Sequence, residues 1–199
     1  MKFTPRSEAT RNFIIEASAE VFNKKGFAGT SITDLEKATG LSKGSIYGNF
    51  ENKDAVALAV LEYNLKKKKE LIRERVALCT TYKDRLRTYI LVHYTTSKIP
   101  FTPGGCPMQN TAIEADDTNE ELRGCAAKAL KQWIQDLTQI VEKGIEAKEF
   151  KPGTDPMTVA LHIISLIEGA AFIGRAIREG GYGKKLLDMG LELIDGIVV

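Results

Sequence analysis

Residues suited to metal binding, disulfides or redox chemistry are scarce in this 199-residue sequence. It holds three cysteines, Cys79, Cys106 and Cys125, and two histidines, His93 and His162. The cysteines are widely spaced and form no C-x-x-C pair, and together with the isolated histidines they give no zinc-ligand spacing. We therefore expect no metal, no cofactor and no disulfide framework, which suits a reducing, cytoplasmic setting.

Signals for export, membrane insertion and catalysis are also lacking. The first residues, MKFTPR, contain no secretory apolar region, and we expect no apolar run that approaches the length of a membrane span. No nucleophile–base pair or phosphate loop is evident, and we interpret Glu114, Asp116 and Asp117 as a loop and capping cluster. The sequence therefore predicts a protein that is not an enzyme and has no membrane partner.

The charges are nearly balanced, with 28 Lys/Arg against 26 Asp/Glu and a net charge of +2. This total does not by itself indicate nucleic-acid binding. Residues 1–75 hold 14 Lys/Arg against 10 Asp/Glu, whereas the remainder holds 14 against 16. The excess of positive charge therefore lies in the N-terminal part, and the C-terminal part is suited to solvent or a partner subunit.

Apolar residues recur at helical spacing along the whole chain, which predicts an all-α protein of about nine helices. We predict a helix-turn-helix domain at 1–51 and a helical effector-binding and dimerisation domain at 52–199. A run of four lysines, 66–69, is expected to be a solvated face. A capping box, Thr118-x-x-Glu121, is expected to open the seventh helix. The predicted helices are 8–25, a short one between Ser31 and Gly40, 43–49, 52–80, 83–97, 107–116, 119–148, 156–179 and 184–197.

Residues 31–53 predict two short helices around a glycine turn, followed by the start of a third helix. Ser31 and Ser42 are suited to cap the two short helices, because a serine hydroxyl accepts a hydrogen bond from a first-turn N–H. Gly40 tolerates the left-handed conformation that ends a helix in a sharp turn. A short helix held in this way and presented by its N-terminus fits the major groove of DNA.

The second short helix has one buried side and one polar side. Ile46 and Phe50 are expected to be buried, which leaves Lys43 and Tyr47 facing outward. The outward set combines a cation, small donors and a long hydroxyl, and this mixture suits phosphates and base edges. The spacing alone is also typical of many all-α proteins, in which such serines act only as caps.

The residues carry more information than their spacing. The motifs NKKGF (23–27), TSI (30–32), ATGLSKGSIY (38–47) and FENKD (50–54) strongly resemble the TetR family of bacterial transcriptional regulators. The resemblance spans about residues 8–60 without a gap. It implies an all-α homodimer that binds a double-stranded DNA operator through its N-terminal domain. It further implies a repressor that a small-molecule effector of unknown identity releases from a pseudo-palindromic site.

The resemblance also implies which residues contact DNA. Thr30, Ser31 and Lys53 would contact the phosphate backbone, and Gly48 departs from the aromatic residue or histidine common in the family. The full predicted DNA-contact set is Thr30, Ser31, Ser42, Lys43, Gly44, Ser45, Tyr47, Asn49 and Lys53.

The helix predicted at 156–179 is apolar nearly all round, which is more than a helix with one side in water needs. Its small residues permit close approach of another helix, and the final helix completes a pair. We predict a four-helix dimer interface as the resemblance implies, with a monomer's own core as the alternative. The predicted interface residues are Ile163, Leu166, Ile167, Gly169, Ala170, Ile173, Gly174, Leu191 and Ile194.

Aromatic and polar residues of the C-terminal part are candidates to line an effector pocket. The same residues also suit an ordinary core, and His93 and His162 are interpreted as satisfied or surface histidines. Two alternatives to a pocket ligand remain open: control by a protein partner, or oxidation of Cys106 at an expected helix N-terminus. The candidate pocket residues are Tyr63, Tyr94, Phe101, Met108, Asn110, Thr111, Trp133 and Phe172.

Overall fold

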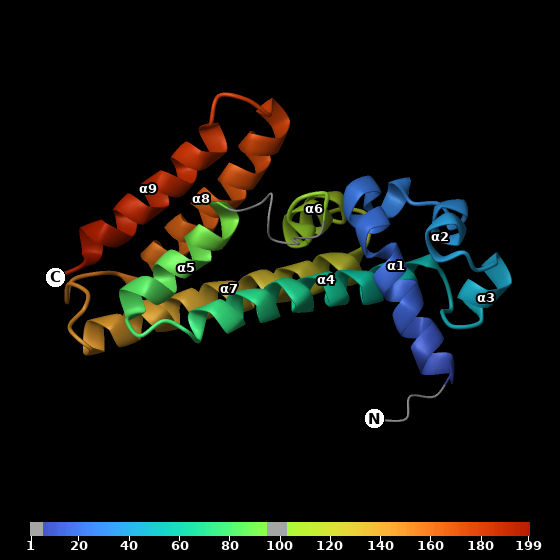
Figure 1. Cartoon of the computed structure of the whole chain (residues 1–199), viewed down its shortest axis with the longest axis horizontal. Helices are drawn as coiled ribbons and strands as arrows, with labels where there is room; N and C mark the ends of the chain where they lie inside the picture. The colour runs from blue at the N-terminus through green and yellow to red at the C-terminus, as the bar shows by residue number, and fades with distance from the viewer. Residues whose placement is uncertain (1–5, 95–102) are drawn as a thin grey trace. The chain divides into compact units, whose positions relative to one another are not determined.

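The computed structural model describes residues 6–94 and 103–199 of the chain. These residues form nine helices and no strand, apart from one isolated bridge between Phe150 and Val198 (Figure 1), so the predicted all-α fold is confirmed. The helices are α1 (Arg6–Gly29), α2 (Ile32–Thr39), α3 (Lys43–Tyr47), α4 (Lys53–Val76), α5 (Tyr82–Tyr94), α6 (Pro107–Glu114), α7 (Glu120–Glu146), α8 (Pro156–Ile177) and α9 (Tyr182–Ile197).

The helices group into two compact units. The first comprises residues 1–67 and 102–128, and the second comprises residues 68–101 and 129–199. This packing division differs from the predicted boundary between residues 51 and 52. The difference arises because α6, the first part of α4 and the start of α7 pack with the N-terminal helices.

The first unit has its own apolar core beneath the two short helices. Leu35 of α2 and Ile46 of α3 are fully buried there, together with Ile14 of α1 and Val56 of α4. Burying a side chain of this size contributes about 1.5–3 kcal/mol. The five-residue α3 is too short to be stable alone, so this core holds it in place.

Side chains cap several of the helix N-termini. Asn52 accepts a hydrogen bond from Ala55 N at 2.8 Å, and Asp155 accepts one from Met157 N at 3.2 Å. The capping box predicted at Thr118 is wrong by one residue. The Thr118 hydroxyl donates back to Glu114 O at 2.7 Å, and Asn119 caps α7 by accepting from Leu122 N at 3.0 Å.

The second unit is built around α8, which packs against α9 and α5. Ile163 and Ile167 of α8 and Ile194 of α9 are essentially fully buried in its core. Among the described residues, α8 is the one helix long and apolar enough to cross a membrane by length and composition alone, with a mean hydropathy of 1.7. The expectation that no apolar run approaches this length is therefore wrong, and one face of α8 is buried in the core of the second unit.

Candidate functional site

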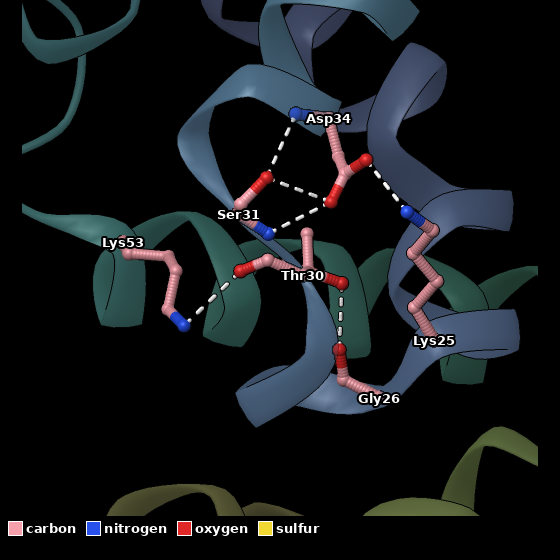
Figure 2. Close-up of polar contacts among 6 residues, drawn as sticks. All are labelled: Lys25, Gly26, Thr30, Ser31, Asp34 and Lys53. Atoms are coloured by element: carbon pink, nitrogen blue, oxygen red, sulfur yellow. Dashed lines mark hydrogen bonds and ion pairs between the residues drawn. The ribbon is translucent and has the colours of Figure 1, made fainter.

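The N-terminus of α2 is held by a network of polar contacts (Figure 2). Ser31 accepts a hydrogen bond from Asp34 N at 3.2 Å, and the Asp34 carboxylate accepts from Ser31 N at 3.0 Å, which completes a capping box. Lys25 Nζ donates to the same carboxylate at 2.6 Å. This bond, followed by those from Ser31, holds the pKa of Asp34 well below its usual range. The Ser31 and Asp34 side chains at the start of α2 are therefore held in place before any ligand binds.

The segment just before α2 is also fixed, by buried and half-buried bonds. Thr30 is 1% exposed and its hydroxyl donates to Gly26 O at 2.6 Å. Lys53 Nζ donates to Phe27 O at 2.9 Å and to Thr30 O at 3.1 Å, the second of which Figure 2 shows. The predicted phosphate contact by the Thr30 side chain is therefore wrong, because its hydroxyl is buried and already engaged. Lys53 joins the α1–α2 connection to the start of α4.

The helix α3 presents its first turn to solvent. Ser42 caps it by accepting from Ser45 N at 3.3 Å, and Glu36 of α2 accepts from Lys43 N at 2.8 Å. Lys43 and Gly44 are exposed, whereas Ile46 on the opposite side is fully buried. The structure thus brings a cation and an open glycine backbone together on a short, capped helix, with Glu36 already occupying one of its N-terminal N–H groups.

The C-terminal end of α3 is more constrained than the sequence suggested. The helix α3 ends at Tyr47 rather than Asn49, and the Asn49 amide donates back to Ser45 O at 2.9 Å. Arg11 of α1 donates to Asn49 O at 2.8 Å, and its guanidinium lies 4.0 Å from the Phe50 ring centroid. Arg11 is not among the predicted site residues, because it is one of several charged residues on α1 and no local pattern distinguishes it.

A second missed residue is Glu114, at the end of α6. Gly26 interrupts α1 with φ 76° and ψ 174°, and the N–H groups of the segment that follows need partners. The Glu114 carboxylate accepts from Phe27 N at 2.7 Å and from Ala28 N at 2.8 Å. The sequence placed Glu114 in a capping cluster, but its partner lies 87 residues away in sequence and no local pattern identifies it.

Taken together, two short capped helices, a tight turn and an exposed cationic first turn define a helix-turn-helix DNA-binding protein. Residues 14–60 match the family model described as bacterial regulatory proteins, tetR family. Residues 83–187 match the model described as tetracyclin repressor-like, C-terminal domain. The chain belongs to the TetR family of transcriptional regulators, and its predicted membership is confirmed.

Solved structures and a curated relative agree with this assignment. A TetR-family regulator from Cytophaga hutchinsonii is 47% identical, with 100% of this chain and 99% of that chain covered and a TM-score of 0.95. A TetR regulator from Chloroflexus aurantiacus J-10-FL is 33% identical, with 98% of each chain covered and a TM-score of 0.92. The HTH-type transcriptional repressor NemR of Escherichia coli strain K12 is 27% identical over 69% of each chain.

Several residues predicted for the dimer interface lie instead in the chain's own core. Ile163, Ile167, Ala170 and Ile194 are at most 7% exposed within a single chain. For these four residues the prediction is wrong, because α8 is apolar nearly all round and the sequence cannot tell its inner face from its outer one. Gly174 is exposed and stays a predicted interface residue. The large apolar side chains that α8 and α9 leave exposed are Met157, Leu161, Phe172, Ile177, Tyr182 and Met189.

The residues predicted for an effector pocket are divided between the two units. Tyr63, Met108, Asn110 and Thr111 belong to the first unit, and Tyr94, Trp133 and Phe172 belong to the second. Phe172 is 63% exposed, so its predicted place in a pocket is wrong for the single chain. Phe101 lies outside the described residues.

Two of these polar side chains already have partners within their own unit. Asn110 donates to Asn23 O at 3.3 Å and to Gly104 O at 3.0 Å. Tyr94 donates to Asp188, and burial followed by this bond raises the pKa of Tyr94 to about 12. Both therefore act in the packing of the chain.

Cys106 and the two histidines complete the set of singled-out residues. Cys106 occupies the N-cap position of α6 but makes no capping hydrogen bond, and it is 7% exposed. This burial does not favour a thiol that reacts readily with oxidants. His93 Nδ1 lies 2.8 Å from Tyr89 O, and His162 is exposed, in agreement with their interpretation as satisfied and surface histidines.

Proposed function

We propose that this regulator is a repressor that binds its operator through α2 and α3 and is released by a small molecule. The observation that supports it most directly is the exposed first turn of α3, backed by the fully buried Ile46. A short helix in this setting keeps its orientation when it enters the major groove. DNA as the partner also implies a cytoplasmic protein.

The polar residues of this region take different roles in the proposal. Lys43, Gly44 and Tyr47 contact DNA directly, and the hydroxyls of Ser31, Ser42 and Ser45 hydrogen-bond to phosphates or base edges. Asn49 contributes its amide oxygen. Thr30 and Lys53 act by fixing the α1–α2 connection, since their polar atoms are engaged within the chain.

The DNA-binding part of the proposal is tested with fluorescence anisotropy on the DNA that flanks the protein's own gene, at several salt concentrations. We expect Lys43→Ala to weaken binding about tenfold and to reduce the salt dependence by about one released counterion. Tyr47→Phe should weaken it less. Lys143→Ala removes the same charge from an exposed position on α7 and should leave affinity unchanged. Equal loss in the Lys43 and Lys143 variants would contradict the proposed contact.

We also propose that the exposed apolar face of α8 and α9 is a dimer interface. TetR-family regulators act as dimers, and exposed apolar patches of this kind mark interfaces. A two-fold axis would then present two copies of α3 to half-sites about 34–36 Å apart, or at a spacing adjusted by subunit splay, in a pseudo-palindromic operator. Sedimentation should give twice the 21.9 kDa chain mass, and Phe172→Asp should shift the protein toward monomer. A wild-type monomer at micromolar concentration would exclude this interface.

Release by a small molecule requires a ligand that binds the DNA-free state more tightly than the DNA-bound state. The helix α4 is suited to link the two events, because it begins with Lys53 and continues without interruption to Val76. The proposal predicts that an effector added to the anisotropy assay weakens operator binding while the protein stays folded. If no compound class shifts the equilibrium, control by a protein partner becomes the better explanation.

A further inference from the structure

A buried ion pair lies inside the second unit, where the sequence predicted only solvated lysines. Lys68 of α4 lies 3.7 Å from Glu168 Oε1 of α8, and the two side chains are 14% and 12% exposed. Both carboxylate oxygens of Glu168 are buried and accept no hydrogen bond. A buried carboxylate in this condition is costly, because it has lost its water and gained no donor in exchange.

Trp133 of α7 also contacts Lys68. The Lys68 ammonium lies 4.9 Å from the centroid of the Trp133 ring, which is the arrangement of a cation–π contact. The indole N–H of Trp133 is buried and has no acceptor. Three helices thus each contribute one side chain, and the lysine ammonium lies between a carboxylate and an aromatic face.

His93 of α5 adds an acceptor rather than a charge. Burial, followed by the charge of Lys68, lowers the pKa of His93 to about 3, so the ring is neutral at physiological pH. A carbonyl oxygen can only accept, so Nδ1 carries the hydrogen that is shared with Tyr89 O, and Nε2 of the neutral ring can only accept. The ring therefore adds no positive charge near Lys68.

We infer that Glu168 and Trp133 form the recognition site for an effector that carries a positively charged nitrogen on an apolar body. The inference rests on the proposed function, a regulator released by a small molecule, and names the chemistry of that molecule. The ammonium group of the ligand takes the place of the Lys68 ammonium, donates to the Glu168 carboxylate and lies against the Trp133 ring. An anionic ligand is disfavoured here, because it would meet the Glu168 charge at short range.

Displacement of Lys68 would also couple ligand binding to the DNA-binding helices through α4. Lys68 and Lys53 lie on the same helix, about four turns apart. When the ligand occupies the position between Glu168 and Trp133, the Lys68 side chain must move to other partners. Binding therefore changes the packing of α4 within the second unit.

The experiment uses the intrinsic fluorescence of the full chain, in which Trp133 is the single tryptophan. The probes are hexylamine, hexanol and hexanoate, which have the same chain length and differ in the charge of the head group. We expect hexylamine to change the Trp133 emission and to bind about tenfold more tightly than hexanol, with hexanoate weakest. Equal affinities for hexylamine and hexanol, or tighter binding of hexanoate, would overturn the inference.

Two variants sharpen this test in opposite directions. Glu168→Gln removes the carboxylate charge and should weaken hexylamine binding about tenfold, whereas Lys68→Met removes the competing cation and should strengthen it. Glu192→Gln, at an exposed position on α9, is the matched control and should bind as the wild type does. If Glu168→Gln does not fold, the comparison of the three probes on the wild-type protein still decides the outcome.

Failure of this inference can be distinguished from failure of the proposed function. Operator binding that a different class of compound releases, with no preference for hexylamine in fluorescence, would overturn the inference alone. A protein that binds hexylamine at Trp133 but binds no operator would instead refute the proposed repressor. We expect hexylamine both to bind at Trp133 and to weaken operator binding in the anisotropy assay.

Discussion

The two units of this protein differ in whether their buried polar side chains have hydrogen-bond partners. In the first unit, the Glu114 carboxylate accepts two backbone N–H bonds, Lys53 donates to two carbonyls and Ser31 forms a full capping box. In the second unit, both oxygens of Glu168 and the N–H of Trp133 are buried without a hydrogen bond. Ser18 of the first unit is the exception there, since its hydroxyl is also buried without a partner.

This difference agrees with the roles that we propose for the two units. A helix-turn-helix element must hold α3 in one orientation before DNA arrives, and fully satisfied polar groups provide that rigidity. A ligand site needs groups whose partners come from the ligand, so it carries a cost in the ligand-free protein.

The largest effect is expected from Gly26→Ala in the first unit. Gly26 has φ 76°, and a Cβ on it would lie 2.6 Å from Glu114 Oε2. The backbone strain, together with the loss of the Glu114 bonds to Phe27 N and Ala28 N, should lower the free energy of unfolding by about 3 kcal/mol. Urea denaturation measures this change in the free energy of unfolding. Gly29→Ala is the control, because its Cβ meets only ordinary contacts; an equal loss there would show that the strain at Gly26 is unimportant.

The second prediction concerns pH and the second unit. The pKa of His93 is lowered to about 3 by burial, whereas an unfolded histidine has a pKa of about 6.5. The unfolded chain therefore binds a proton that the folded chain does not, and stability falls as the pH drops from 6.5 toward 3. The free energy of unfolding should be about 2 kcal/mol lower at pH 5 than at pH 8.

Denaturation at both pH values separates this effect from the other histidine. His93→Gln should remove most of the difference, while His162→Gln, at an exposed position, should keep it. A pH dependence that survives in the His93 variant would mean that carboxylates, and not this ring, control acid stability.

The smallest effect is expected from replacing the buried ion pair by apolar residues. Lys68→Met combined with Glu168→Leu removes two desolvated charges and should leave stability unchanged or raise it by about 1 kcal/mol. Thermal unfolding measures the change, and the double variant should no longer prefer hexylamine. If the double variant is strongly destabilised, the pair is a structural element and the contrast between the units is weaker than we describe.

The sequence by itself determined the local features of this protein. Ser31, Gly40 and Ser42 specified the ends of α2 and α3, since capping and left-handed turns depend on residues only two to four positions apart. Helical periodicity predicted nine helices, and the motif at 38–47 identified the family. The Thr118 box was the one cap misplaced, because the neighbouring Asn119 competes for the same role.

What only the tertiary structure decided were the contacts between residues far apart in the chain. Glu114 accepts a hydrogen bond from a backbone N–H of α1 that lies 87 residues away in sequence. Lys68, unlike the exposed lysines beside it, contacts Glu168 and Trp133. The sequence could not tell which face of α8 turns inward, because nearly every face is apolar. Periodicity predicts that a side chain is buried, but the residues it is buried against depend on how distant helices pack. In α8 this packing buries Ile163 and Ile167 in the core and leaves Leu161 and Phe172 exposed.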